Sequence, residues 1–340
     1  QVQPIEPVFV DYKKDMSQFE AQPGIDVLYK KNETNDIFTL IYVFNTGTEN
    51  DPALNLAFNY LSYLGTDKMT AEEIASEMYD IACSFYMNAG ANQSSIQITG
   101  LSENMGKAME IVEGLIAGAK PDEAILENLK GDMLKSRADA KLNQSRCFGA
   151  LQRYLFYGGD FIRRTTLTDP ALQALTSEQL LAKIGGLMGK QHEVLYYGPQ
   201  KETEIKSALA EHHKVAADLQ PLEKKFSALL PTDANKVVLA QYDAKQLYYL
   251  QFSNRGEKFD VAADPEITLY NEYFGGGMNT IVFQEMREAR GLAYSAWATL
   301  ATPSNANGDY SYYAFIATQN DKMQKDVEAF DDIINNMPES

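Results

Sequence analysis

The sequence is poor in the residues that form disulfides and bind metals. Its 340 residues include two cysteines, Cys83 and Cys147, and three histidines. Two cysteines make no disulfide framework and have no metal-binding spacing, so we interpret them as buried thiols and leave open whether they pair. Long apolar runs are also missing. The longest candidate, residues 37–44, has the length of a strand and not the roughly 18 residues of a membrane span, so no membrane-spanning helix is predicted.

Positive charge is scarce as well. The chain has 30 lysines and arginines against 47 aspartates and glutamates, which gives a net charge of −17 and a pI near 4.7. Such a surface repels phosphate backbones, so a nucleic-acid partner is not expected, and its acidity is typical of a solvated surface. The first residues show no methionine and no apolar signal core. A cytoplasmic location and a periplasmic one after removal of a signal both stay open.

The sequence does contain one order of elements that occurs twice. At 45% hydrophobic residues the chain can form two cores. Each block is predicted to run strand, helix, glycine break, helix, two strands and helix. In the first block, Thr70 followed by Glu73 predicts a capping box. The predicted ranges are 37–46, 52–64, 70–82, 84–89, 94–99 and 102–116 in the first block, and 246–253, 262–274, 279–290, 292–300, 309–318 and 322–336 in the second.

The two blocks define the predicted domains. The first block continues with helices predicted over 121–142, 144–157 and 176–188 and a strand over 193–197, which have no counterpart in the second. We therefore predict an α+β fold of two tandem homologous α/β-sandwich domains with mostly antiparallel sheets, the second truncated at its C-terminal end. The domains are predicted at 21–215 and 236–340, with linkers over 1–20 and over the polar, proline-containing stretch 216–235.

The strongest functional pattern lies at residues 274–294. Asn279 is placed to cap a helix and Gly291 to end it. Arg287 then falls in the last helical turn, and Tyr294 falls near the start of the following strand. This corner can therefore aim a guanidinium and a phenol at one point.

Three consecutive glycines, Gly275, Gly276 and Gly277, precede this helix. A phosphate-binding loop would need a strand before the glycines and a lysine at the helix start. The preceding segment is predicted to be helical, and Met278 and Asn279 provide no lysine. We interpret the glycines as a site of close helix packing or as a turn that faces a substrate.

Arg287 and Tyr294 also have a purely structural interpretation. Arg287 could pair with Glu285 or Glu288, and Tyr294 could pack without a further role. Arg290 is the competing arginine, and its place at the predicted helix end favours a helix-end charge. We rank Arg287 first and Arg290 second.

The order of elements and the motif at residues 275–295 resemble the pitrilysin/insulysin (inverzincin) family of zinc metallopeptidases. The motif reads Gly-Gly-Gly-Met, then Phe-Gln-Glu-Met-Arg ending at Arg287, then Arg-Gly-Leu-Ala-Tyr ending at Tyr294. The resemblance implies two homologous halves of the LuxS/mitochondrial-processing-peptidase-like metallohydrolase fold that close around a peptide. It also implies that the carboxy-terminal half supplies Arg287 and Tyr294 to the substrate and transition state, with Gly275, Gly276 and Gly277 binding substrate.

The family's zinc signature, His-x-x-Glu-His, is absent from this chain. Residues 56–60, on the equivalent helix, read Leu-Ala-Phe-Asn-Tyr. We interpret His192 as a strand-edge residue. His212 and His213 are adjacent at a helix end, and side chains about 100° apart on a helix rarely share a metal. No metal site is therefore expected in this chain, and zinc is expected in the amino-terminal half.

These observations predict the substrate-binding, carboxy-terminal half of a bacterial zinc-dependent metalloendopeptidase, inactive by itself. Its expected partners are a peptide substrate and the amino-terminal, zinc-bearing half. Two alternatives stay open: a separate non-catalytic subunit of a two-chain peptidase, and a non-enzymatic scaffold subunit of the same fold. A scaffold would not need Arg287 and Tyr294 to be accessible.

Overall fold

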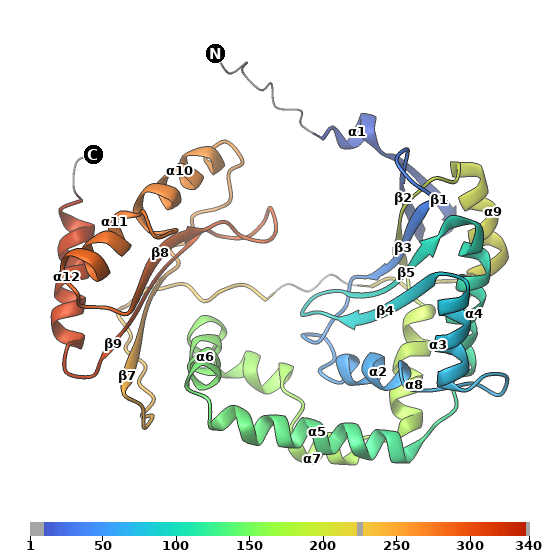
Figure 1. The fold of residues 1–340 in the computed structure, drawn as a ribbon, viewed down its shortest axis with the longest axis horizontal. Helices are drawn as coiled ribbons and strands as arrows, with labels where there is room; N and C mark the ends of the chain where they lie inside the picture. Colours follow the sequence, from blue (N-terminus) through green and yellow to red (C-terminus); the bar gives the residue numbers. More distant parts are fainter. Residues whose placement is uncertain (1–9, 223–226, 338–340) are drawn as a thin grey trace. The chain divides into compact units, whose positions relative to one another are not determined.

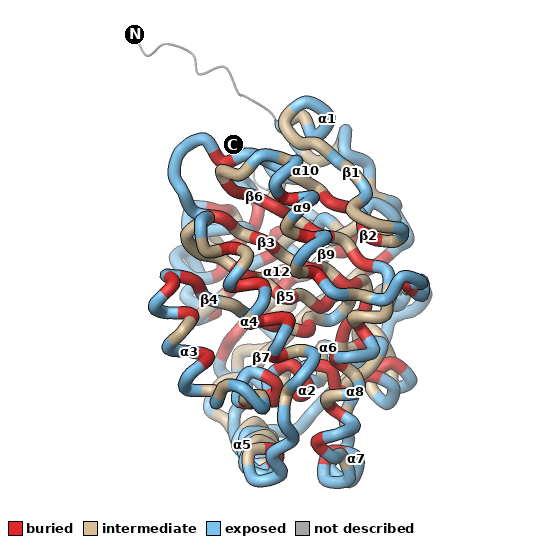
Figure 2. Tube along the Cα trace, turned by 90° about the vertical axis from the view of Figure 1, so that its right-hand side faces the viewer, coloured by how far each residue is buried: buried red, intermediate tan, exposed pale blue. Residues whose placement is uncertain are grey.

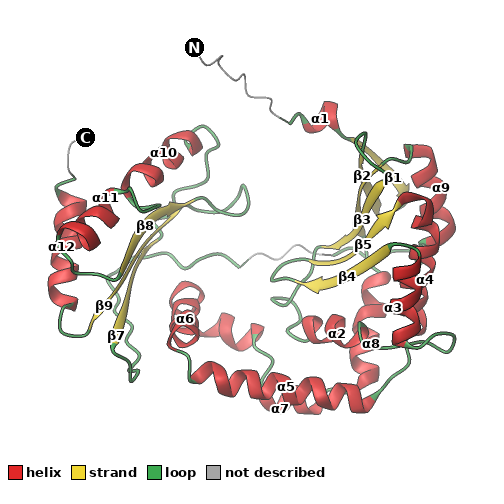
Figure 3. Cartoon of the chain, in the orientation of Figure 1, coloured by secondary structure: helices red, strands yellow, loops and turns green. Residues whose placement is uncertain are grey.

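The computed structural model describes residues 10–222 and 227–337, and the chain forms two compact units (Figure 1). Unit 1 comprises residues 1–136 and 163–226, and unit 2 comprises residues 137–162 and 227–340. Each unit combines helices with a sheet that is wholly or mainly antiparallel (Figure 3). The predicted α+β class is confirmed.

Unit 1 is built on a six-stranded sheet in the order β1-β2-β6-β3-β5-β4. Neighbouring strands are antiparallel except β2 and β6, which run parallel. The last strand in the sequence of this unit therefore lies in the interior of the sheet. The strands are β1 (Ser17–Gln22), β2 (Ile25–Lys31), β3 (Ile37–Phe44), β4 (Cys83–Ala89), β5 (Ser94–Leu101) and β6 (His192–Gly198).

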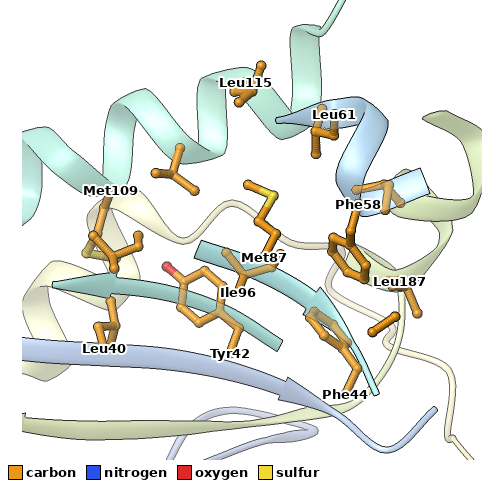
Figure 4. Close-up of a cluster of buried hydrophobic side chains, with 14 of the residues drawn as sticks. Leu40, Tyr42, Phe44, Phe58, Leu61, Met87, Ile96, Met109, Leu115 and Leu187 are labelled. Carbon is orange, nitrogen blue, oxygen red and sulfur yellow. The ribbon is translucent and has the colours of Figure 1, made fainter. Parts of the chain in front are cut away.

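The core of unit 1 follows from alternation along β3. Phe38, Leu40, Tyr42 and Phe44 are buried, while the residues between them are partly exposed. Successive strand residues point to opposite faces, so one face of β3 is apolar and covered. Figure 4 shows part of this cluster, with Leu40, Tyr42 and Phe44 of β3 below Met109 and Met87. Buried residues of unit 1 recur on the neighbouring strands β5 and β6 (Figure 2).

Helices cover one face of this sheet, with α3, α4 and α9 along it in Figure 3. Their apolar residues, such as Ile74, Met109 and Ile205, belong to the same core as β3. The helices of this unit begin with a short α1 (Tyr12–Asp15) and continue with α2 (Leu54–Leu61), α3 (Ala71–Asp80), α4 (Met105–Gly118), which follows a 3₁₀ turn (Ser102–Asn104), α5 (Glu123–Lys141), α7 (Asp169–Ala174), α8 (Ser177–Met188) and α9 (Glu202–His212).

The capping box predicted at the start of α3 is confirmed. The Thr70 hydroxyl accepts from the Glu73 N–H at 3.2 Å, and the Glu73 carboxylate accepts from the Thr70 N–H at 2.8 Å. We expect Thr70→Ala to destabilise α3 by about 1 kcal/mol, because the helix loses one of its satisfied first-turn donors. Hydrogen exchange of the α3 amides measures the change. Thr70→Ser keeps the hydroxyl and should exchange like the wild type; equal losses in both variants would contradict the capping explanation.

Unit 2 has a three-stranded antiparallel sheet in the order β7-β9-β8. Its strands are β7 (Gln246–Ser253), β8 (Ser295–Ala301) and β9 (Ser311–Gln319). Residues of the following helices form one core with Ala314 and Ile316 of β9. These helical elements are α10 (Asp264–Phe274), α11 (Ile281–Phe283), the π-helical turn η2 (Gln284–Ala289) and α12 (Met323–Asn335).

Helix α6 (Gln144–Thr165) joins unit 2 through aromatic contacts. Phe148 lies 5.5 Å from the ring centroid of Tyr248, and Phe156 lies 4.6 Å from that of Phe252. The helix is interrupted at Gly158, whose φ of 81° is in the left-handed region. The compact units therefore differ from the predicted domain 21–215, since residues 137–162 cluster with the second sheet.

Other features of the sequence are placed by the structure as follows. Residues 17–20, predicted as part of a linker, lie in β1, where they pair with β2. Cys83 is buried and Cys147 is partly exposed, and both are free thiols. Within the described residues, none of the helices has the length and apolar character needed to span a membrane.

Candidate functional site

The corner at residues 274–294 contains a π-helical turn, which is wider than an α-helical turn. The helix begins at Ile281, after Thr280, whose hydroxyl donates to the Gly277 carbonyl at 2.6 Å. The predicted cap at Asn279 is therefore wrong by one residue. From Gln284 the turn is π-helical, as seen in the hydrogen bond from the Arg290 N–H to the Glu285 carbonyl, five residues earlier. Such single π-turns are rare and frequently occur at functional sites.

The end of the turn sends the chain into β8. Gly291 has φ of 58°, the left-handed conformation that was predicted for the residue that ends the helix. The Tyr294 N–H donates to the Ala317 carbonyl at 2.9 Å, while Ala317 is also the register partner of Ser295. Tyr294 therefore lies directly before β8, and its backbone is fixed at the end of the β8–β9 pairing.

The structure brings Arg287 and Tyr294 together. The guanidinium carbon of Arg287 lies 5.8 Å from the ring centroid of Tyr294 and 5.0 Å from that of Phe283. A guanidinium at such distances from two aromatic rings is held by cation–π attraction, about 0.5–1 kcal/mol for each exposed contact. Its donors remain accessible, since 45% of the Arg287 side chain is exposed, and Tyr294 is 70% exposed.

Phe283 is the member of this site that the sequence analysis did not single out. The apolar character of Phe283 predicted a core position on the helix, whereas the structure places its ring beside Arg287. The four-residue spacing of Phe283 and Arg287 could have indicated this contact, because residues four apart lie on one helical face. The nearest acidic group is Glu288, whose carboxylate lies 3.6 Å from the Arg287 Nε in a solvent-exposed pair.

Arg290 has a different environment. It forms ion pairs with Glu285 at 3.5 Å and with Asp332 of α12 at 3.0 Å. Hydrogen bonding from Arg290 lowers the pKa of the Asp332 carboxyl, which is the direction expected for a carboxylate beside a fixed cation. Arg290 thus ties η2 to α12 while Arg287 faces solvent.

The three glycines have distinct surroundings. A Cβ atom at Gly275 would lie 2.3 Å from the Ala298 carbonyl oxygen, so only glycine allows α10 to end this close to β8. The Ala298 N–H donates to the Gly275 carbonyl at 3.3 Å. A Cβ at Gly276 would lie 2.9 Å from the Asn271 oxygen, whereas nothing lies within 4 Å of a Cβ at Gly277. Close packing therefore accounts for Gly275 and leaves Gly277 beside open space.

The segment equivalent to the zinc signature is packed into the core of unit 1. On α2, Leu56, Ala57, Phe58 and Tyr60 are buried. The Tyr60 hydroxyl donates to the Ser177 Oγ at 2.8 Å and accepts from the Asp122 N–H at 2.7 Å. This helix holds the core together and offers no metal ligand. Across residues 10–222 and 227–337, no cluster of three or more His, Cys, Asp or Glu side chains could hold a metal ion.

The histidines are arranged differently from the sequence interpretation. His192 begins β6, but it is buried, and its Nε2 lies 2.8 Å from the Nε2 of His213. His213, which follows the last residue of α9, is buried as well, with its Nδ1 2.5 Å from Glu113 Oε1. His212 stays outside this cluster and lies 3.7 Å from Glu110. The strand-edge interpretation of His192 is incomplete, because the strand order puts β6 in the interior of the sheet.

Comparison with known proteins indicates the family. Residues 191–339 match the family model described as the peptidase M16 inactive domain. This part of the chain is similar to the inactive domain of the M16 peptidases. An uncharacterised zinc protease of Streptomyces coelicolor is 23% identical to this chain over 266 residues, which are 73% of this chain and 56% of that protein. The chain thus spans little more than half the length of that bacterial relative.

Solved structures share the fold of this chain. The peptidase M16 inactive domain from Pseudomonas fluorescens matches with a TM-score of 0.75 and 18% identity, over 95% of this chain and 80% of that one. The periplasmic protease PqqL of Escherichia coli matches with a TM-score of 0.76 and 14% identity, over 95% of this chain and 36% of that one. The predicted resemblance to the carboxy-terminal, non-zinc half of this family is confirmed.

Proposed function

We propose that this chain is the substrate-binding half of a zinc-dependent metalloendopeptidase and that Arg287 and Tyr294 contact the peptide at the reacting carbonyl. The observation that carries the proposal is the accessible pair itself, a guanidinium held near a phenol on a π-helical corner. A zinc-bearing half would supply the metal and the general base, with which the pair would close a peptide chamber. Gly277, beside open space, is the glycine best placed to border the peptide.

The chemistry of the pair fits this task. Attack of water on a peptide carbonyl creates an oxyanion, and donors aimed at that oxygen stabilise the transition state. A guanidinium supplies several N–H donors in a fixed fork, and a phenol supplies one O–H donor. Neither group activates water or binds zinc, so the pair assists a reaction that the other half begins.

Accessibility favours this proposal over a non-enzymatic scaffold. A scaffold role would suit an arginine engaged by several carboxylates, which describes Arg290, paired with Glu285 and Asp332, better than Arg287, which is paired with Glu288. Tyr294 is 70% exposed, so its packing inside unit 2 does not explain its presence at the corner. A separate subunit of a two-chain peptidase would use the same pair. The coding sequence distinguishes that case by showing whether a zinc-bearing half shares the reading frame.

Tyr294→Phe tests the proposal with a minimal change. The variant keeps the ring beside Arg287 and removes only the hydroxyl, so the corner should stay folded. With the zinc-bearing half present, we expect kcat to fall roughly tenfold, the value of one hydrogen bond of about 1.4 kcal/mol. Steady-state cleavage of a fluorogenic peptide measures this. Tyr273→Phe, another exposed tyrosine of unit 2, is the control and should keep full turnover; equal turnover in both variants would remove Tyr294 from the site.

A further inference from the structure

A buried chain of polar side chains in unit 1 lies outside the candidate site. It joins Glu113 of α4, His213 after α9 and His192 at the start of β6, all at most 9% exposed. Glu113 Oε1 lies 2.5 Å from His213 Nδ1, the two histidine Nε2 atoms are 2.8 Å apart, and His192 Nδ1 lies 2.7 Å from the Lys190 carbonyl oxygen. Burying such groups is costly unless their hydrogen bonds are complete.

The hydrogen bonds fix where the protons lie. The Lys190 carbonyl can only accept, so His192 Nδ1 must donate to it. In a neutral His192 ring the Nε2 is then an acceptor, and His213 Nε2 must carry the proton between the rings. The bond between His213 Nδ1 and Glu113 Oε1 holds one more proton, because two acceptors cannot bond to each other. The closed cluster therefore has a neutral His192 that accepts from the His213 Nε2–H, and one proton between His213 and Glu113.

The surroundings supply no further titrating partner for His192. On β3, the Tyr42 ring lies 4.2 Å from His213 and the Phe44 ring 4.7 Å from His192. Burial of the Tyr42 hydroxyl beside Glu113 raises its pKa well above the usual value. It therefore stays neutral.

Charged groups of α4 and α9 lie beside His212, while Lys190, Glu193 and Lys214 flank the two buried histidines in the sequence. The His212 ring lies 3.7 Å from Glu110 and 3.9 Å from Glu211. From β2, the register partner of His192 is the apolar Ile25.

A second proton on His192 would break the hydrogen bond between the two histidines, at the centre of the buried cluster. Protonation of His192 Nε2 removes the acceptor for His213 and sets two N–H donors against each other at the 2.8 Å contact. Burial, together with the charge of His213, lowers the pKa of His192 to about 4. The folded arrangement therefore resists this proton, whereas an opened arrangement in water accepts it at an ordinary histidine pKa.

The cluster sits where a short segment returns to the sheet. After His213 the chain runs back to Gln220, which accepts from the Gln191 N–H at 2.8 Å and donates its N–H to the Gly189 carbonyl at 3.0 Å. His213 and Gln220 thus hold both ends of residues 213–220 beside the start of β6. Loss of the His213 contact leaves the backbone bonds at Gln220, the bond from the Gln22 side-chain amide to the Ala216 carbonyl at 3.3 Å and the buried Leu219 to hold this segment.

We propose that Glu113, His213 and His192 form an acid-released lock that fixes residues 213–220 against β6 and α4 at neutral pH. The lock concerns unit 1 and does not depend on the proposed role of Arg287 and Tyr294. A folded pKa lowered below the unfolded value of about 6.5 makes opening more favourable as pH falls from about 6.5 towards 4. Above that window the lock is closed.

Hydrogen exchange in the full chain tests the lock. From pH 7 to pH 5, after correction for the chemical exchange rate, the opening constant of residues 205–220 should rise roughly fivefold in the wild type, because proton uptake by His192 favours opening about 20-fold and the proton already held in the closed His213–Glu113 bond offsets this about fourfold. His192→Gln offers an acceptor that does not titrate, so its opening constant should not rise. His212→Gln removes the neighbouring histidine and should respond like the wild type. An unchanged opening constant in the wild type, or an equal acid response in His192→Gln, would overturn the proposal.

Side-chain nitrogen NMR of the wild type provides a second test that needs no variant. At pH 7 we expect His192 to carry one ring proton, on Nδ1, and His213 to carry a proton on Nε2. A His192 that carries its proton on Nε2 at pH 7, or that becomes protonated at pH 5 while residues 213–220 stay protected, would overturn the proposal. The expected proton pattern, together with acid-induced loss of protection, would support it.

Discussion

Arg287→Ala is expected to lower kcat of the assembled peptidase about 100-fold, the usual loss when one preorganised donor to a developing oxyanion is removed. The guanidinium lies beside Phe283 and Tyr294 with its donors accessible, so the variant removes those donors without opening the core. Because the contact is proposed to form with the transition state, kcat and kcat/KM should fall together. Steady-state hydrolysis of a fluorogenic peptide by the chain together with a zinc-bearing half gives both constants.

Arg290→Ala is the matched control for this result. Arg290 has the same side chain three residues later on the same corner, but its guanidinium is engaged by Glu285 and Asp332. We expect this variant to keep turnover near that of the wild type. Turnover that survives Arg287→Ala, or that falls equally in both arginine variants, would contradict the role given to Arg287.

Gly275→Ala is expected to destabilise unit 2 by about 2 kcal/mol, since the added methyl group would meet backbone atoms that cannot rotate away. The built Cβ lies 2.3 Å from the Ala298 carbonyl oxygen and 2.7 Å from the Ala298 nitrogen. The Asn271 side chain holds the same junction, with bonds of 2.8 Å and 3.0 Å to the Leu300 N–H and carbonyl. Relief of the clash must therefore move α10 away from β8.

Trp297 provides a direct probe for this prediction. It is the single tryptophan of the chain, lies on β8 and stacks on Phe315 at 5.7 Å. Urea unfolding followed by its fluorescence reports on unit 2. Gly277→Ala is the control, because nothing lies within 4 Å of its added carbon, and it should unfold at the wild-type midpoint. If the two variants unfolded at the same urea concentration, the close approach of α10 and β8 would not explain Gly275.

Much of the local structure could be predicted because its determinants are near in sequence. The capping box at Thr70, the left-handed Gly291 and the strand over residues 246–253 are short-range patterns, and the structure has all of them. The convergence of Arg287 and Tyr294 also followed from local order, since a helix, a glycine stop and a strand define one corner. Family membership was predictable from the same motif.

Other features depend on contacts between distant residues. Nothing in the sequence of α6 indicates that Phe148 and Phe156 pack against β7, which lies about a hundred residues later. Residues 137–162 were therefore predicted with the first sheet. The parallel pairing of β2 with β6 buries His192 beside His213, which no spacing along the chain indicates. The π-helical turn likewise has no simple composition signal, because it differs from an α-helix only in which carbonyl accepts each N–H.

Peptide hydrolysis by this chain with zinc added, compared with the same chain mixed with a zinc-bearing half, tests whether the chain is the non-catalytic half of a zinc peptidase. The described residues provide an accessible arginine and tyrosine that lie together and no cluster of metal ligands. We predict no turnover by the chain alone at any zinc concentration, and chelator-sensitive turnover in the mixture that depends on Arg287. Metal-dependent hydrolysis by the chain alone would contradict its assignment as the half without zinc.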